Sequence, residues 1–202
     1  MSQQIGEGSG SPDAALLMSA ASGDTAGVSR ALSAGAALEA RDHRGRTALL
    51  LAVAGDHLEV ARVLLLRGAD PDAVDDTSDT PWLVTGVTGS VAMLELLLPA
   101  QPDMTLRNRY GGIAVIPASE RGHVAYVQRV VQTGIDVDHV NDLGWTALLE
   151  AVILGDGSAR YQEIVRILLS AGADPTLADR EGVTPVQHAR RLGHAHLAAL
   201  LG

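Results

Sequence analysis

The stretch LLLRGADPDA, residues 64–73, decides the fold of this chain, because it returns later as LLSAGADPTLA, residues 168–178. In both places a leucine-rich run is followed by a glycine, Gly68 or Gly172. Glycine suits the end of a helix, since it adopts the left-handed backbone conformation without a steric penalty. The Asp-Pro pair that follows favours an extended backbone. The repeated stretch therefore predicts a boundary between structural units of one kind.

Similar segments recur every 33 residues through most of the chain, which is the mark of a repeat architecture. The final start comes 38 residues after the one before it, so the fifth unit carries about five extra residues. The chain thus divides into six units, the last of them truncated. The units begin near Ala14, Thr47, Thr80, Ile113, Thr146 and Thr184.

Each unit has the pattern of two short helices followed by an extended hairpin-like segment. A threonine, often followed by Ala or Pro, suits the start of the first helix as N-cap and first helical residue. A glycine then ends that helix. The second helix has apolar residues three and four positions apart, as in residues 58–65. The pattern predicts helix pairs that bury their apolar faces against neighbouring units.

These units resemble the ankyrin repeat family, whose pattern is TPLHxA…GH…LL…GAD. The matching segments here are TALLLA…DH…LLLRGAD, TPWLVT, ERGHVAYVQRVV, TALLEA…LLSAGADP and TPVQHA…LGH. The resemblance covers about residues 13–202 and implies an all-α repeat solenoid, in which helix-turn-helix repeats stack with short β-hairpin loops between them. On this basis residues 1–12 are expected to form a flexible N-terminal tail and residues 13–202 a single domain. The units expected within it are 13–46, 47–79, 80–112, 113–145, 146–183 with an inserted loop near 156–160, and 184–202 as a truncated cap.

Several positions depart from the family pattern. Pro99 and Gln101 stand where a helix end and a glycine are expected, and Pro117 falls within the first helix of its unit. A proline distorts a helix unless it lies in the first turn. We therefore expect an irregular middle of the stack and a protruding loop at the insertion, residues 156–160. The family's motif histidine is replaced by Leu50, Leu83, Ile116, Leu149 and Gln187.

Composition narrows the classes of function. The net charge is −9 over 202 residues, and all 15 basic residues are arginine. Because nucleic-acid binding needs clustered positive charge, nucleic acid is not the expected partner of such an acidic chain. The chain has no cysteine, which excludes a thiolate nucleophile and fits a cytoplasmic location. No secretory signal is evident, and the longest uncharged stretch, residues 80–94, is interrupted by Pro and Gly. We therefore expect no membrane association.

The histidines suggest structural roles rather than a metal site. His57, His123 and His194 fall at the family's GH position, where we expect bonds to neighbouring backbone. His188, His194 and His196 are close in sequence, but His194 and His196 point to different faces of a helix and no carboxylate cluster adjoins them. We therefore expect no bound metal and no cofactor.

The carboxylates also favour structural roles. DPDAVDD, residues 70–76, lacks the glycine and the terminal glutamate of a calcium-binding loop. One place in successive units holds an acidic residue or asparagine that could stabilise a turn. Motifs for phosphate binding or a serine nucleophile are absent from the sequence. The turn positions are Asp42, Asp75, Asn108, Asn141 and Asp179.

The resemblance also implies a binding surface on the hairpin tips and the exposed side of the first helices. At these places the chain carries arginines, which favour an acidic partner surface, and an apolar patch of the residue types found at interface hot spots. The competing interpretation places Ile153 and Leu154 under the inserted loop and Trp145 flat on the next hairpin. Trp82 is expected in the core. The candidate partner-binding residues are Arg41, His43, Arg44, Arg46, Arg107, Arg109, Tyr110, Leu143, Trp145, Ile153 and Leu154.

Together these patterns predict a non-enzymatic, monomeric protein-protein interaction module that binds a partner protein of unknown identity through its concave face. An inhibitor, immunity or scaffold protein would act in this way. The alternative is an enzyme or metal-dependent protein that uses the C-terminal histidines and the inserted loop. A third hypothesis, nucleic-acid binding through the arginines, would require affinity that falls steeply with salt.

Overall fold

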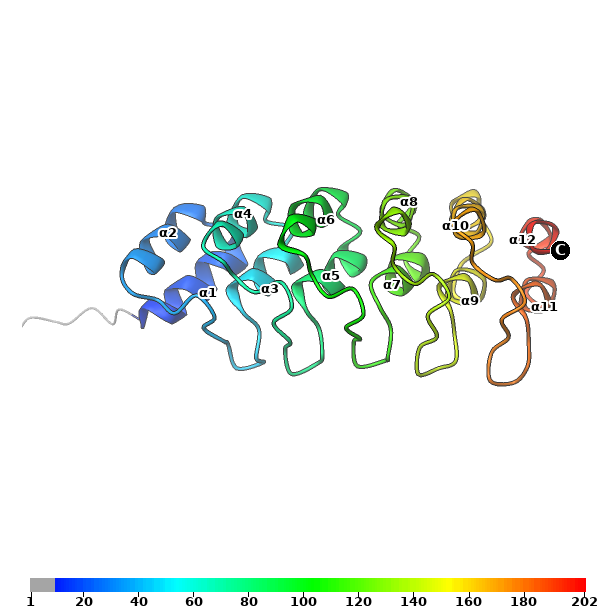
Figure 1. The fold of residues 1–202 in the computed structure, drawn as a ribbon, viewed down its shortest axis with the longest axis horizontal. Helices are drawn as coiled ribbons and strands as arrows, with labels where there is room; N and C mark the ends of the chain where they lie inside the picture. The colour runs from blue at the N-terminus through cyan, green and yellow to red at the C-terminus, as the bar shows by residue number, and fades with distance from the viewer. Residues whose placement is uncertain (1–9) are drawn as a thin grey trace, which may run out of the picture.

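The computed structural model describes residues 10–202, which form a row of stacked helix pairs (Figure 1). The first helices of the units line up in one layer, the second helices in another, and the connecting hairpins project beyond the first layer. The predicted all-α repeat solenoid is confirmed. The α-helices are α1 Pro12–Ser22, α2 Thr25–Ser33, α3 Ala48–Ala54, α4 Leu58–Leu66, α5 Pro81–Thr88, α6 Val91–Leu97, α7 Val115–Glu120, α8 Val124–Val130, α9 Ala147–Ile153, α10 Ala159–Ser170, α11 Pro185–Arg191 and α12 Ala195–Leu201, and the 3₁₀ turns are η1 Leu98–Ala100 and η2 Val131–Thr133.

The first helix, α1, begins at Pro12, one residue before the expected start of the first unit. The Ser11 side chain accepts a hydrogen bond from the Ala14 N–H and so caps this helix. Most of the predicted flexible tail, residues 1–9, lies outside the described residues.

Threonines are the N-cap residues of four first helices, α3, α5, α9 and α11, as the sequence pattern predicts. The side-chain oxygens of Thr47, Thr80 and Thr146 each accept the backbone N–H three residues on. These bonds satisfy donors that a helix leaves unpaired at its start. The motif histidine of the family is therefore not needed for these helices to start at the right residue.

The middle of the stack is irregular in the way its sequence suggests, but Pro117 is accommodated. It is the third residue of α7, within the first turn, so no intrahelical hydrogen bond is lost. Helices α6 and α8 end in the 3₁₀ turns η1 and η2. Gln101, which replaces the expected glycine, has φ +54°, a left-handed conformation that strains a side chain by about 1 kcal/mol.

The five inserted residues do not form the protruding loop that we predicted. The connection from α9 to α10, residues 154–158, has two residues more than the three that join α3 to α4. The other three extend α10 to 12 residues, compared with 9 in α4. An added helical turn satisfies its own backbone groups and packs on a neighbour, which an exposed loop cannot do. Accordingly, the Tyr161 hydroxyl donates to the Glu120 carbonyl oxygen at 2.9 Å.

The core is built almost entirely from Leu, Val, Ile and Ala between successive units. Trp82 is fully buried, as predicted, and its Nε1 has no hydrogen-bond partner within residues 10–202. Tyr126 is also fully buried, and its hydroxyl shares a 2.7 Å hydrogen bond with the hydroxyl of Thr85 in the preceding unit. Because each unit packs chiefly on its neighbours, the stack grows by repetition of one interface.

Histidines at the GH position join successive units, which confirms the predicted role for two of the three. His57 Nε2 lies 3.1 Å from the Ala21 carbonyl oxygen, and His123 Nε2 lies 3.1 Å from that of Val87. His194 instead packs closely on Gly157, where an added Cβ would lie 2.4 Å from its Nδ1.

Carboxylates join three pairs of successive units in a similar way. Glu39 accepts the Asp70 backbone N–H at 3.0 Å, and Asp138 accepts that of Asp174 at 2.9 Å. Asp72 accepts the Asp103 N–H through both of its oxygens. Part of the acidic composition therefore serves the stacking of units.

Candidate partner-binding groove

Each hairpin is shaped by the turn residue that the sequence analysis singled out. The Oδ1 atom of Asn108 accepts the backbone N–H groups of Tyr110 and Gly112. The equivalent oxygen of Asn141 does the same two and four residues on. One side chain thus holds the whole tip and sets the direction of the residues on it. The same pattern recurs at Asp42, Asp75 and Asp179.

A groove of about 360 Å³ lies between two of these hairpins and the helices behind them. One side comes from residues 108–112 and the other from residues 141–143, while α7 and α9 form the floor. We call this the hairpin groove. It is lined by Asn108, Arg109, Tyr110, Gly112, Ile116, Pro117, Glu120, Arg121, Asn141, Leu143, Glu150 and Leu154.

Three members of the predicted apolar patch line the hairpin groove together. Tyr110 is 53% exposed, Leu143 is 52% exposed and Leu154 is 48% exposed. Exposed large apolar side chains gathered at one hollow mark a partner site more specifically than scattered ones. The Arg109 guanidinium lies 4.7 Å from the centre of the Tyr110 ring, a cation–π contact that holds both side chains at the rim.

Two carboxylates, Glu120 and Glu150, complete the lining, and the sequence analysis did not single out Glu150. Glu150 is only 5% exposed, and its Oε1 accepts a 2.9 Å hydrogen bond from Asn141 Nδ2. Burial raises the pKa of the Glu150 carboxyl to about 7, the Glu120 charge adds to this rise, and the bond from Asn141 opposes it. The groove therefore combines an apolar wall with a carboxyl group whose pKa lies near 7.

A signal for Glu150 was present in the repeat alignment. The equivalent positions hold Leu51, Val84 and Pro117, so a glutamate there breaks an apolar pattern. In the last unit the position holds His188, whose Nε2 lies 2.6 Å from Asp179 Oδ2. A charged residue at a buried position of a repeat is a stronger pointer to a site than one at a hairpin tip.

Other predicted residues of the apolar patch lie outside the hairpin groove. Trp145 and Ile153 are half-buried and Arg107 is exposed, and none of the three lines the groove. Leu154 is not covered by the inserted residues, because these continue into α10. The structure thus brings together four of the predicted residues, namely Arg109, Tyr110, Leu143 and Leu154.

The first group of predicted residues, Arg41, His43, Arg44 and Arg46, is partly engaged in contacts within and between hairpins. The Arg41 guanidinium donates to the carbonyl oxygens of Gly45 and Val74, which ties one hairpin to the next. Arg46 pairs with Asp42 at 2.7 Å. Desolvation by burial raises the pKa of Asp42, but the bonds and charge of Arg46 outweigh it and hold this pKa at about 2.

His43 and Arg44 remain exposed at the tip of that first hairpin, away from the hairpin groove. The cluster therefore presents fewer free charges to a partner than the sequence alone suggests.

The C-terminal histidines do not converge. His188 is held by Asp179, His194 lies on Gly157 and His196 is exposed on α12. Within the part of the chain that the structure describes, no group of three or more His, Asp or Glu residues could hold a metal ion.

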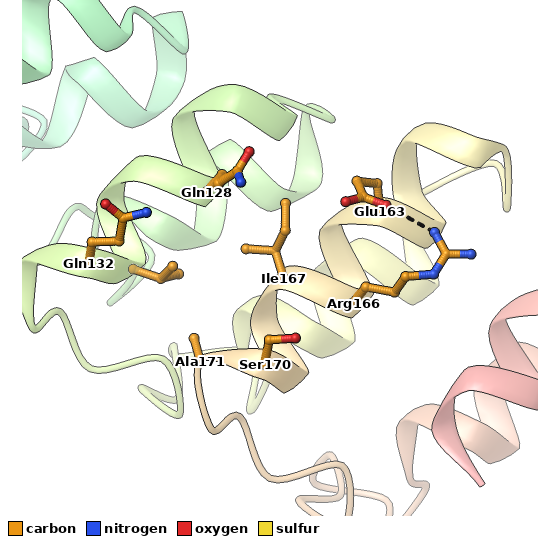
Figure 2. A pocket seen from close by; sticks show the side chains of 8 residues that line it. Gln128, Gln132, Glu163, Arg166, Ile167, Ser170 and Ala171 are labelled. Atoms are coloured by element: carbon orange, nitrogen blue, oxygen red, sulfur yellow. Dashed lines mark hydrogen bonds and ion pairs between the residues drawn. The ribbon is translucent and has the colours of Figure 1, made fainter.

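A second groove, of about 540 Å³, lies on the outer helices α8 and α10. Figure 2 shows Gln128 and Gln132 on one side of it and Ile167 on the other, with the Glu163–Arg166 ion pair at its edge. None of the predicted site residues lines this groove. Its lining is mostly amide and apolar, and its two charged residues, Glu163 and Arg166, already pair with each other at 3.0 Å.

Among residues 10–202, the helices are too short or too polar for any to cross a lipid bilayer.

The sequence matches known repeat patterns over most of its length. The pattern described as Ankyrin repeats (3 copies) matches residues 84–179, and the single Ankyrin repeat pattern matches residues 44–76. The chain is 37% identical over 186 residues to YahD of Escherichia coli K12, which is named as an ankyrin repeat protein, and the alignment covers 92% of each chain.

Solved structures of the same kind superpose closely. An ankyrin repeat domain from Acinetobacter baumannii matches with a TM-score of 0.87 and 46% identity, covering 92% of this chain and 95% of the other. The ankyrin repeat domain of Bcl-3, a member of the IkappaB protein family, matches with a TM-score of 0.82 and 26% identity, covering 96% of this chain and 86% of the other.

Proposed function

This chain belongs to the ankyrin repeat family, and we propose that it binds one partner protein through the hairpin groove. The family generally serves protein–protein interaction without catalysis. The single observation that carries the proposal is the gathering of Tyr110, Leu143 and Leu154 around one hollow. Leaving these side chains in water is unfavourable by about 25 cal/mol for each Å² of apolar surface, so their exposure calls for a reason outside the fold.

Rigidity of the stack supports this proposal. Asn108 and Asn141 each hold a hairpin tip through two backbone N–H groups, and the Tyr110 carbonyl oxygen accepts the Asp142 N–H across the two tips at 2.9 Å. A groove with fixed walls loses little conformational freedom when a partner docks, so more of the contact energy appears as affinity.

The biological action that we propose is occlusion or assembly, as an inhibitor, immunity or scaffold protein. Repeat units extend from Pro12 to Leu201, and the hairpin groove is built from the repeats themselves. This region therefore acts by binding a partner protein. If the captured partner is an enzyme, adding the purified chain in excess should inhibit it, whereas a scaffold would leave its rate unchanged.

Quantitative capture from a lysate of the source cells tests the binding proposal. Three immobilised forms of the full chain are compared: wild type, the groove variant Tyr110→Ala/Leu143→Ala, and the control Met18→Ala/Leu66→Ala. The control removes two exposed apolar side chains on α1 and α4, outside the hairpin groove.

At least one protein should be captured equally by wild type and control, and about tenfold less by the groove variant, as expected for hot-spot residues. Equal capture of the same proteins by all three forms would remove the hairpin groove as the binding site. Circular dichroism melts of each form establish that the groove variant is folded.

A further inference from the structure

The floor of the hairpin groove holds two carboxyl groups that pair with no basic side chain of residues 10–202. Glu120 and Glu150 both line the groove, on α7 and α9. Within residues 10–202, no ion pair includes either carboxylate. A buried carboxylate without a cationic partner is unfavourable, and such groups concentrate where a ligand supplies the missing charge.

The fold itself does not require this glutamate. Leu51, Val84 and Pro117 occupy the same place in earlier units, and all three are compatible with the same helix pair. In the last unit, His188 at this position has a hydrogen-bond partner of its own, Asp179 Oδ2 at 2.6 Å. Glu150 is therefore the one carboxylate at this repeat position of the sequence, and within residues 10–202 the only hydrogen bond to its side chain comes from a neutral amide, Asn141 Nδ2.

The positive charges of the groove are placed differently from the negative ones. Arg109 is exposed at the hairpin tip, where its guanidinium lies over the Tyr110 ring. Arg121 is exposed at the end of α7. Both arginines are in contact with water, which screens their charge, whereas Glu150 is desolvated. A guest that enters the groove thus meets an apolar wall and then carboxylates.

From this geometry we propose that the hairpin groove takes an arginine or lysine side chain of the partner protein, with the cationic end between Glu120 and Glu150 and the aliphatic stem against Tyr110, Leu143 and Leu154. This inference rests on the proposed function and names the chemistry of the partner. Long basic side chains bury their methylene stems on apolar surface while the charged end finds a polar partner. The partner surface is then basic at the contact, contrary to the acidic surface that the arginines of the sequence suggested.

A random dodecapeptide library displayed on phage and selected on the immobilised full chain tests this inference. Selected peptides are synthesised, and their affinities are measured for wild type and for the charge variant Glu120→Gln/Glu150→Gln. The matched control Glu163→Gln/Glu181→Gln neutralises two exposed carboxylates outside the hairpin groove. Gln at position 150 retains an oxygen that can accept the bond from Asn141.

The expected result is that selected peptides share an Arg or Lys, and that the charge variant binds them about tenfold more weakly while the control does not. Replacing the shared basic residue by Gln should weaken binding to wild type by a similar factor. The same replacement should leave binding to the charge variant unchanged.

Two other results have separate meanings. Selected peptides that lose affinity for Tyr110→Ala/Leu143→Ala but carry no basic residue, or carry acidic ones, would overturn this inference and leave the proposed function standing. Selection of no peptide, or of peptides that bind the Tyr110→Ala/Leu143→Ala variant as tightly as wild type, would overturn both. Melting curves of all variants, measured alongside, distinguish loss of a contact from loss of the fold.

Discussion

The buried carboxyl of Glu150 predicts that one substitution, Glu150→Gln, stabilises the protein at alkaline pH and not at acidic pH. Burial and the Glu120 charge raise the folded pKa of Glu150 from 4.5 to about 7. A group with a raised folded pKa binds its proton more tightly in the folded state than in the unfolded chain. Its contribution to stability is therefore full below about 4.5 and is lost as the pH rises through about 7.

The magnitude follows from the size of the rise. Each tenfold change in the ionisation constant corresponds to about 1.4 kcal/mol, so a rise from 4.5 to about 7 sets an upper limit of about 3 kcal/mol. The effective dielectric constant at buried protein sites is well above that of a dry interior, which reduces this effect. We expect a difference in pH dependence between wild type and variant of about 1 to 2 kcal/mol.

Urea unfolding followed by circular dichroism measures this difference. Wild type and Glu150→Gln are compared at about pH 5 and about pH 8, on either side of the folded pKa. The free energy of unfolding should favour the variant more strongly at the higher pH, because Gln keeps the acceptor for Asn141 and carries no charge to desolvate. Parallel pH profiles for the two proteins would show that the carboxyl is not perturbed by burial, and the reasoning about the groove floor would fail with it.

Two further predictions concern contacts between units. Tyr126→Phe should lower the free energy of unfolding by about 0.5 to 1.5 kcal/mol, because the buried Thr85 hydroxyl loses its 2.7 Å partner; an unchanged urea midpoint would contradict this. Gly89→Ala should lower the melting temperature more than Gly134→Ala. Both positions have positive φ, so the backbone penalty is shared. An added Cβ at Gly89 would lie 2.4 Å from His123, whereas at Gly134 nothing lies within 4 Å. Equal melting temperatures for the two variants would refute the close packing of His123 on the preceding unit.

The sequence was sufficient for the fold because the relevant signals are local and repeated. Thr47 and its equivalents cap their helices through a hydrogen bond from a residue three positions on, so both partners lie within one short segment. Turn residues such as Asn141 likewise act within four residues. A 33-residue period then implies that every unit packs on the next one, whatever its details.

Some local departures were harder to interpret from sequence. Pro117 was compatible with a distorted helix or an intact one, and only the observed start of α7 at Val115 places it in the first turn. The insertion, residues 156–160, was expected to form a loop because it falls between the two predicted helices of its unit. Packing of Tyr161 against the carbonyl of Glu120 favours the helical turn instead, and that contact spans 41 residues.

The sequence by itself thus determined the repeat period, the helix pairs, the hairpin turns and the surface on which Tyr110 and Leu143 lie. Only the tertiary structure decided which of those residues share one hollow, that Arg41 and Arg46 are occupied by neighbouring groups, and that Glu150 is desolvated beside Glu120. The physical reason is distance along the chain. Capping and turn formation are settled by residues within a few positions, whereas burial, charge proximity and groove shape depend on side chains that come together only when whole units stack.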